Sequence, residues 1–160
     1  MGARLLRGWL LRPLARLEPI LDRLDAVEEL AFRTADRSRL RDALGAVQDI
    51  ERLVSRAALG TATPRDLAAL RRSLSAVPRV RAVLADCRAP LVLSLLGSLD
   101  DLADVREPLE ATLVEEPPAQ ARDGGCVRDG VDGFLDAMRD VSRNGKAHIA
   151  AMEDAERTRT

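Results

Sequence analysis

Aromatic side chains are nearly absent from this 160-residue sequence, which has one Trp, two Phe and no Tyr. Surfaces that bind single-stranded nucleic acid stack bases on aromatic rings, so the composition disfavours such a surface. Histidine is equally scarce. No Ser or Cys motif lies near the single residue, His148, to form a nucleophile–base pair with it. The sequence therefore predicts no catalytic residues.

Cysteine and glycine patterns give no metal or cofactor site either. Cys87 and Cys126 lie 39 positions apart, unlike the ligands of a zinc knuckle or the thiols of a redox pair. The stretches DGGCVRDG and RNGK contain glycine, but no Lys-Ser/Thr follows them and no strand precedes them, as a phosphate loop requires. Asp100, Asp101 and Asp104 are predicted to form a solvated acidic face, because a calcium site needs a folded loop with six or more oxygens.

Long hydrophobic runs are also lacking. The longest uncharged run, Ala89–Leu99, has eleven residues, whereas a membrane-spanning helix needs about twenty. Four arginines interrupt the apolar residues of the first seventeen positions, which disfavours a secretory signal. We predict a cytoplasmic protein with no membrane partner. An Arg-rich start without acids also resembles a mitochondrial transit peptide, and this alternative stays open.

Charge is balanced overall but divided unevenly along the chain. The net charge is −1, so no global field attracts nucleic acid. Residues 1–81 hold 16 Arg and 10 acids, a net of +6, and residues 82–160 hold 9 bases and 16 acids, a net of −7. The two halves therefore attract each other or face different neighbours.

Apolar residues recur at helical spacing along the chain, while the alternation typical of strands is absent. The fold class predicted is all-α, an irregular multi-helix core bundle with a long C-terminal helix. Prolines, glycines and capping residues place the expected helix ends. We expect Pro19 in the first turn of a second helix. A third helix is expected to begin at its cap Asp36, to continue past Ile50 to Val54 and to stop at Gly60. Thr63-Pro64 should start the next helix, with a bend or break at Pro78, while Pro90 should start an apolar segment that reaches Val105 and Pro108 a short helical piece.

The last part of the sequence combines a loop with the longest apolar pattern. Residues 114–130, VEEPPAQARDGGCVRDG, hold two prolines and several glycines and charges, so they predict a loop. The pattern after the loop predicts a helix from about Asp132 to beyond Glu156, with Gly145 as a weak point. Its apolar positions are Val131, Leu135, Met138, Val141, Ile149 and Met152.

Several motifs, in order along the whole chain, resemble the central region of MutS, a family of mismatch-recognition ATPases. The start MGARLLRGWLLRPL followed by RLDAVEEL is similar to the beginning of the family's core domain. The run DIERLVSRAALGTATPRDLAALRRSL is the most specific signature. The stretches RDGGCVRDGVDGFLDAMRD and NGKAHIAAMEDAERTRT resemble the loop before the family's outgoing lever helix and that helix itself.

The resemblance implies a division into a helical core, residues 1–130, and an outgoing lever helix, residues 131–160, that leads toward a clamp domain. It implies a non-catalytic segment that couples mismatched-DNA binding to ATP binding and hydrolysis in a longer parent protein. ATP and Mg would act in the parent's ATPase domain, so this segment needs no cofactor of its own. The implied partners are the other domains of the parent, mismatched double-stranded DNA, and a second parent copy in a homodimer.

Three residues receive roles under the resemblance. Trp9 is expected to anchor the core at the base of the lever helix, and Arg157 and Arg159 are weak candidates for DNA contact. Ordinary solvated arginines are the competing interpretation of the last two. A free-standing helical adaptor, without DNA or nucleotide binding of its own, is the alternative for the chain as a whole.

Overall fold

The computed structural model describes residues 2–159, without the side chains of residues 146–148, 150, 151, 153 and 158. The all-α prediction is confirmed, because within residues 2–159 the β structure is limited to one isolated antiparallel bridge between Leu113 and Val127. The helices are α1 (Gly2–Leu11), α2 (Leu17–Phe32), α3 (Thr34–Gly45), α4 (Ile50–Ala58), α5 (Pro64–Leu84), α6 (Pro90–Ser98), α7 (Ala103–Thr112), the 3₁₀ turn η1 (Ala121–Asp123) and α8 (Gly133–Arg159).

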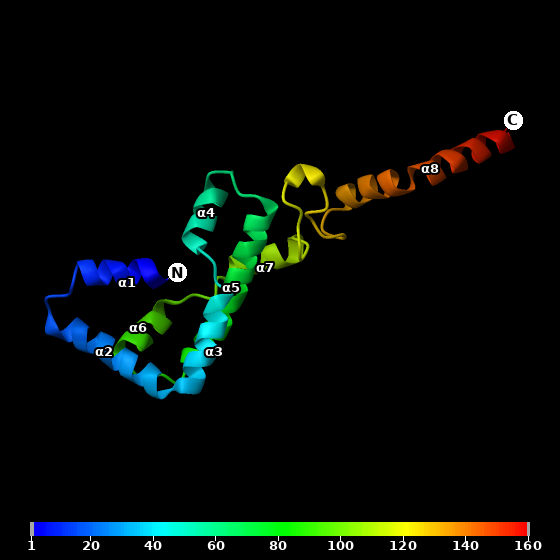
Figure 1. The fold of residues 1–160 in the computed structure, drawn as a ribbon. Helices are drawn as coiled ribbons and strands as arrows, with labels where there is room; N and C mark the ends of the chain where they lie inside the picture. Colours follow the sequence, from blue (N-terminus) through cyan, green and yellow to red (C-terminus); the bar gives the residue numbers. More distant parts are fainter. Residues whose placement is uncertain (1, 160) are drawn as a thin grey trace.

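Helix α5 is the centre of the molecule. It packs against α3, α4, α6 and α7, and it contributes more buried side chains than any other described helix. One core cluster joins α4 and α5 and is formed by Leu53, Ala69, Leu70 and Leu74. A second cluster, of Ala26, Cys87, Ala89 and Val92, fastens α2 to the start of α6. Helices α1, α2 and α6 lie at one end of the molecule, and α8 extends away from the other (Figure 1).

The start of α5 follows the sequence prediction. Thr63 Oγ1 accepts a hydrogen bond from the Asp66 backbone N–H at 3.2 Å, and Asp66 Oδ2 accepts one from the Thr63 backbone N–H at 2.8 Å. These reciprocal bonds form a capping box that satisfies two backbone donors otherwise left without partners. The Thr63 backbone and hydroxyl bonds, with Arg56 at 3.1 Å, lower the pKa of Asp66. Gly60, with φ +68°, follows the end of α4 as predicted.

The predicted start of a helix at Pro108 and the predicted break at Pro78 are wrong. Pro78 does not break its helix, since α5 continues through it to Leu84. Pro108 does not begin a helix, since it lies inside α7, which starts five residues earlier at Ala103. Proline removes one backbone hydrogen bond from a helix interior. On both sides of Pro78, Leu74, Val77 and Val80 are buried in the core, and their packing offsets that cost.

The predicted third helix is divided in two. Asp36 is not its cap: it lies in the first turn of α3, where it pairs with Arg33 and Arg39, each at 3.5 Å. The helix ends at Gly45, and Asp49 begins α4 by accepting a hydrogen bond from the Arg52 N–H at 3.2 Å. The Gln48 N–H between them donates to Ser73 Oγ of α5 at 3.0 Å. A hydrogen bond donated to a side chain of another helix thus stabilises the break.

The predicted apolar segment from Pro90 to Val105 is also interrupted. Helix α6 ends at Ser98, and the chain turns at Leu102, whose φ of +47° places it in the left-handed region. Asp100 Oδ1 accepts a hydrogen bond from the Leu102 N–H at 2.9 Å, and Arg81 of α5 pairs with Asp101 at 3.2 Å. These polar contacts hold a backbone conformation that non-glycine residues rarely adopt.

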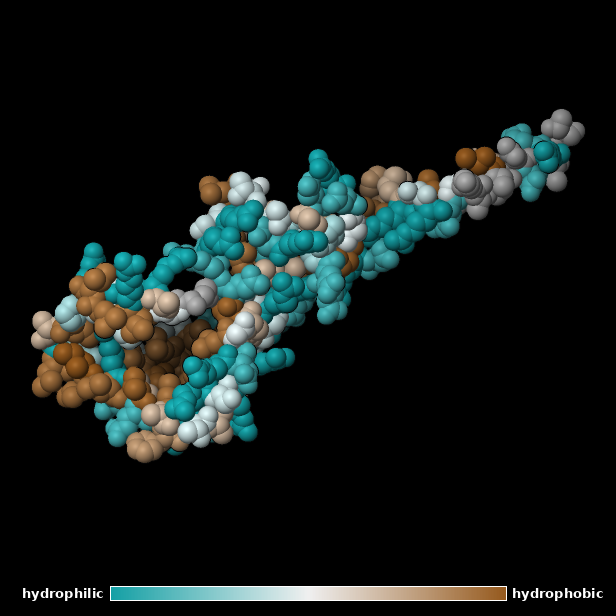
Figure 2. All heavy atoms as spheres, in the orientation of Figure 1, coloured by the Kyte–Doolittle hydropathy of each residue, from teal (hydrophilic) through white to brown (hydrophobic). Residues whose placement is uncertain are grey.

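Hydrophobic side chains gather over the end formed by α1, α2 and α6 (Figure 2). Helix α1 has no buried residue, and Leu10 and Phe32 are 75% and 79% exposed. Trp9 is 38% exposed, with the Arg23 guanidinium 3.7 Å from its ring centre. The predicted role of Trp9 as an anchor at the base of α8 is therefore wrong, because α1 and α8 lie at opposite ends (Figure 1).

Candidate functional site

The segment between α7 and α8 closes on itself and brings residues 126–128, which precede α8, next to the end of α7. The Val114 N–H donates to the Cys126 carbonyl at 3.1 Å, and the Arg128 N–H donates to the Thr112 carbonyl at 2.8 Å. These bonds flank the Leu113–Val127 bridge. The loop predicted over residues 114–130 is therefore closed, because residues 126–128 are bonded to the end of α7.

A buried arginine fastens this segment to the central helix. Arg71 of α5 is 6% exposed, and its Nη1 donates to the carbonyls of Leu113 and Val114 at 2.9 and 3.0 Å. Its Nη2 donates to the Glu115 carbonyl at 2.8 Å. Three charge-assisted hydrogen bonds satisfy much of the donor capacity of a planar guanidinium. Arg128 Nε adds a second donor to the Leu113 carbonyl at 2.6 Å.

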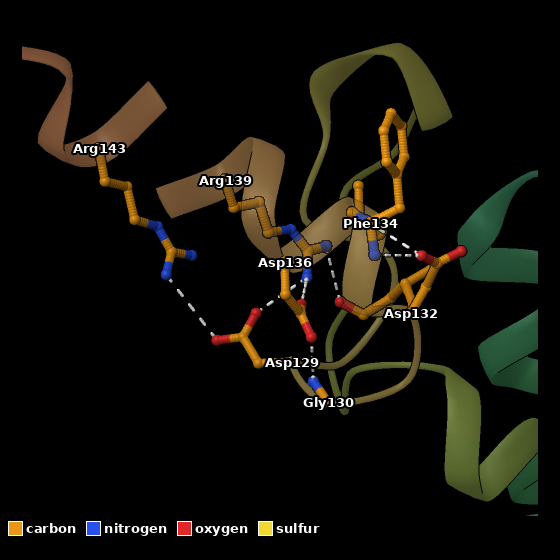
Figure 3. A network of polar contacts seen from close by, with 9 residues as sticks. Asp129, Gly130, Asp132, Phe134, Asp136, Arg139 and Arg143 are labelled. Atoms are coloured by element: carbon orange, nitrogen blue, oxygen red, sulfur yellow. Dashed lines mark hydrogen bonds and ion pairs between the residues drawn. The ribbon is translucent and has the colours of Figure 1, made fainter. Parts of the chain in front are cut away.

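The first turn of α8 is fixed by two carboxylates (Figure 3). Asp132 Oδ1 accepts hydrogen bonds from the backbone N–H groups of Phe134 and Leu135 at 2.9 and 3.0 Å, which caps the helix. Asp136 Oδ2 accepts one from the Gly130 N–H at 2.7 Å. Gly130 has φ +88°, where a side chain would be strained, so glycine is needed at this turn.

Arg139 links the body of α8 to the closed segment (Figure 3). Its side chain is 16% exposed, and its Nη1 lies 2.8 Å from Asp129 Oδ1 and 3.5 Å from Asp136 Oδ1. Its Nη2 donates to the Val127 carbonyl at 2.9 Å. Arg143, one turn further, is 68% exposed and reaches Asp129 Oδ2 at 3.8 Å. Arg139 therefore links α8 to the segment before it through both a side chain and a backbone carbonyl.

These contacts form a continuous path from the central helix to α8. It runs from Arg71 to the backbone of residues 113–115, across the bridge to residues 127–129, and on to Arg139. We call this set of contacts the α8 joint. Hydrogen bonds from guanidinium groups to carbonyls are directional, so the joint can fix the direction in which α8 leaves the core.

Comparison with known proteins gives the family. Residues 1–159 match the family model for MutS domain III. The chain belongs to the MutS domain III family. It is 46% identical over 160 residues to the DNA mismatch repair protein MutS of Symbiobacterium thermophilum, and 45% identical over 160 residues to that of Myxococcus xanthus. The identity to the Methanosarcina mazei MutS is 43% over 164 residues.

All of this chain aligns in each of these three pairs, but it covers 18% of each relative. The MutS resemblance found in the sequence motifs is thus confirmed. The chain spans less than a fifth of the length of the MutS proteins it matches.

The domain III structure places the predicted DNA-contact residues away from the joint. Arg157 and Arg159 are exposed in the last turn of α8, at the opposite end of that helix from Arg139. The side chain of His148 lies outside the described residues.

Sequence reasoning missed Arg71 and Arg139. The spacing Asp129, Asp136, Arg139 around a Gly-Val-Asp-Gly turn was an available signal for Arg139, because it places opposite charges at the start of a helix.

The described residues show neither a membrane span nor a metal site. None of the helices described here is both long and apolar enough to cross a bilayer. In the part of the chain that the structure describes, no group of three or more His, Cys, Asp or Glu is arranged to hold a metal ion. Asp101, in the predicted acidic face, pairs instead with Arg81. Cys87 is 1% exposed, and burial raises the pKa of its thiol.

Proposed function

We propose that this domain III segment mechanically couples movements of the DNA-binding end of a longer mismatch repair protein to movements of its ATP-hydrolysing end. In this proposal the segment is non-catalytic, and ATP and Mg act in the parent's ATPase domain. The observation that carries it is the α8 joint, which connects the most deeply packed helix to the one helix that extends from the body. Coupling between distant sites requires packed elements of this kind.

The length of α8 makes it suitable as a lever. Its 27 residues span about 40 Å at 1.5 Å per residue. A rotation of about 10° at the joint would therefore displace the far end by about 7 Å. The joint has three directional contacts at Arg139, so a change in the position of residues 127–129 moves the base of α8 with it.

A chimeric protein tests the coupling role. We expect that this chain can replace the aligned segment of the Symbiobacterium thermophilum MutS, to which it is 46% identical. The chimera should restore mismatch repair in cells without their own MutS, and mismatched duplex DNA should change its ATP turnover as it does for the unmodified host protein. A chimera that folds, hydrolyses ATP and binds mismatched DNA, but whose turnover ignores that DNA, would contradict coupling through this segment.

The DNA-contact proposal for Arg157 and Arg159 has a separate test in the same chimera. Each phosphate contact contributes about one unit to the slope of log affinity against log salt. Replacing both arginines with Ala should therefore flatten this slope by up to about two units if both contact phosphates. The measurement is DNA binding by fluorescence anisotropy over a series of salt concentrations. An unchanged slope would show that they are ordinary solvated arginines.

A further inference from the structure

Helix α5 is covered on most of its surface, and its exposed arginines form a regular pattern. Between Pro64 and Val80, all described, the exposed residues are Arg65, Arg72 and Arg79. Their seven-residue spacing is close to two helical turns, so the three side chains lie on one face and follow one another at about 10.5 Å. A buried helix that exposes three arginines in register presents a row of positive charge.

These arginines have no partner in the part of the chain that the structure describes. No side-chain hydrogen bond or ion pair of Arg65, Arg72 or Arg79 occurs there, whereas neighbouring Arg71 uses two guanidinium nitrogens for three hydrogen bonds. A planar guanidinium can bind both oxygens of a carboxylate at once. The row therefore offers three such groups, each free for an external partner.

Three hollows lie along the row. A hollow of about 370 Å³ is lined by Arg65 and Arg72, one of about 530 Å³ by Arg72 and Arg79, and one of about 330 Å³ by Arg79 and Val83. Adjacent hollows share Arg72 or Arg79 among their lining residues, and we call the three hollows together the groove. From residue 65 to residue 83 the groove is about 27 Å long, which equals about five turns of helix.

The groove walls are suited to a helix. Small side chains line all three hollows and would let the backbone of a partner approach closely: Ala43, Ala46, Ala68 and Ala76. The rim also carries acidic groups, Asp42, Glu115 and Glu116. A polyanion such as DNA would be repelled by these carboxylates, whereas a protein helix with both signs of charge can match the row and the rim together.

We propose that this groove docks an α-helix of a partner protein that presents carboxylates at seven-residue intervals, flanked by basic residues. The carboxylates pair with Arg65, Arg72 and Arg79, and the flanking bases face Asp42, Glu115 and Glu116. Helices commonly dock in grooves of this kind through side chains spaced along one face. The charge pattern, more than apolar area, sets which helix is accepted.

Two synthetic peptides of about 22 residues, each about 33 Å long as a helix, test the proposal. Both have the same composition of Ala, Gln, Lys and Glu, but the in-phase peptide carries three Glu at seven-residue intervals flanked by Lys, and the out-of-phase peptide distributes them around the helix. Fluorescence anisotropy with the 160-residue chain should show at least about eightfold tighter binding of the in-phase peptide, since each of three pairs contributes about two- to fivefold.

Matched variants locate the binding. The groove variant Arg65→Ala/Arg72→Ala/Arg79→Ala should lose the preference for the in-phase peptide. The control variant Arg7→Ala/Arg12→Ala/Arg88→Ala, with the same change in charge at exposed positions outside the groove, should keep it. Equal binding of the two peptides, or an unchanged preference in the groove variant, would overturn the proposal. The proposal would also be overturned if the unmodified chain and the control variant bound a 20-base-pair DNA duplex but the groove variant did not, since that result would assign the row to DNA.

A charge exchange keeps the test valid even if the triple variant folds poorly. Arg72→Glu changes one exposed side chain that has no partner in the described chain, so circular dichroism should match the unmodified protein. This variant should reject the in-phase peptide and accept the peptide whose central Glu is replaced by Lys. If the exchange restores no binding, the pairing at position 72 is wrong.

Discussion

Replacing Arg71 with Ala is expected to lower the free energy of unfolding by about 3–5 kcal/mol, because three carbonyls lose their donor and each unsatisfied buried group costs about 1–3 kcal/mol. The substitution leaves the carbonyls of Leu113, Val114 and Glu115 without their donors and leaves a void where a 6% exposed side chain was. Arg71→Lys should fall between Ala and the native residue. Its single ammonium keeps the charge but lacks the planar pair of nitrogens that reaches three carbonyls.

Urea unfolding measures the loss, and the adjacent residue provides the control. Arg72→Ala removes the same side chain from an exposed position on the same helix, so we expect a change within about 0.5 kcal/mol. Hydrogen exchange should show where Arg71→Ala acts, with the N–H groups of Val114 and Arg128 exchanging faster than those of α5. Equal stabilities of the two variants would mean that Arg71 does not hold the segment.

The helical elements were largely predictable because their signals are local. The capping box of Thr63 and Asp66 needs residues three positions apart, and the stop at Gly60 depends on one residue's freedom to adopt a positive φ. Apolar spacing then identified the helices but not always a buried face, since α1 has no buried residue and Met138, Val141, Ile149 and Met152 of α8 are exposed. These features are encoded within a few residues and do not depend on which helix lies opposite.

The errors and omissions arose where a distant residue decides the outcome. The break between α3 and α4 depends on Ser73, 25 positions beyond Gln48, and continuation of α5 through Pro78 depends on packing by its neighbours. Arg71 resembles a surface residue in the sequence, because its three acceptors are backbone carbonyls more than 40 positions away. Every residue type has a backbone carbonyl, so no sequence motif indicates which carbonyls accept these hydrogen bonds.

Replacing Arg139 with Ala is expected to release the base of α8 while leaving the core folded. It removes the 2.8 Å contact with Asp129 and the 2.9 Å bond to the Val127 carbonyl, at a cost of about 1–3 kcal/mol for bonds to a charged group. Asp132 still caps the helix, so α8 should remain helical but lose its fixed direction. The expected result is therefore a change in orientation more than in helix content.

Distances between spin labels can measure that change. Labels at Ala82 of α5 and Met152 of α8 occupy exposed positions. Cys126 would be replaced by Ser, while Cys87 can remain, because burial protects its thiol and raises its pKa. The distance distribution should broaden in Arg139→Ala. It should stay narrow in Arg143→Ala, whose exposed 3.8 Å pair with the same Asp129 contributes little.

The same two variants connect the joint to the proposed function. In the chimera, Arg139→Ala should weaken the effect of mismatched DNA on ATP turnover and leave turnover without DNA unchanged, because the lever no longer follows residues 127–129. Arg143→Ala should leave both unchanged. If Arg139→Ala broadens the distance distribution but the response to mismatched DNA is intact, the joint positions α8 without carrying the signal. Coupling would then have to pass through contacts that other parts of the parent protein make with α8.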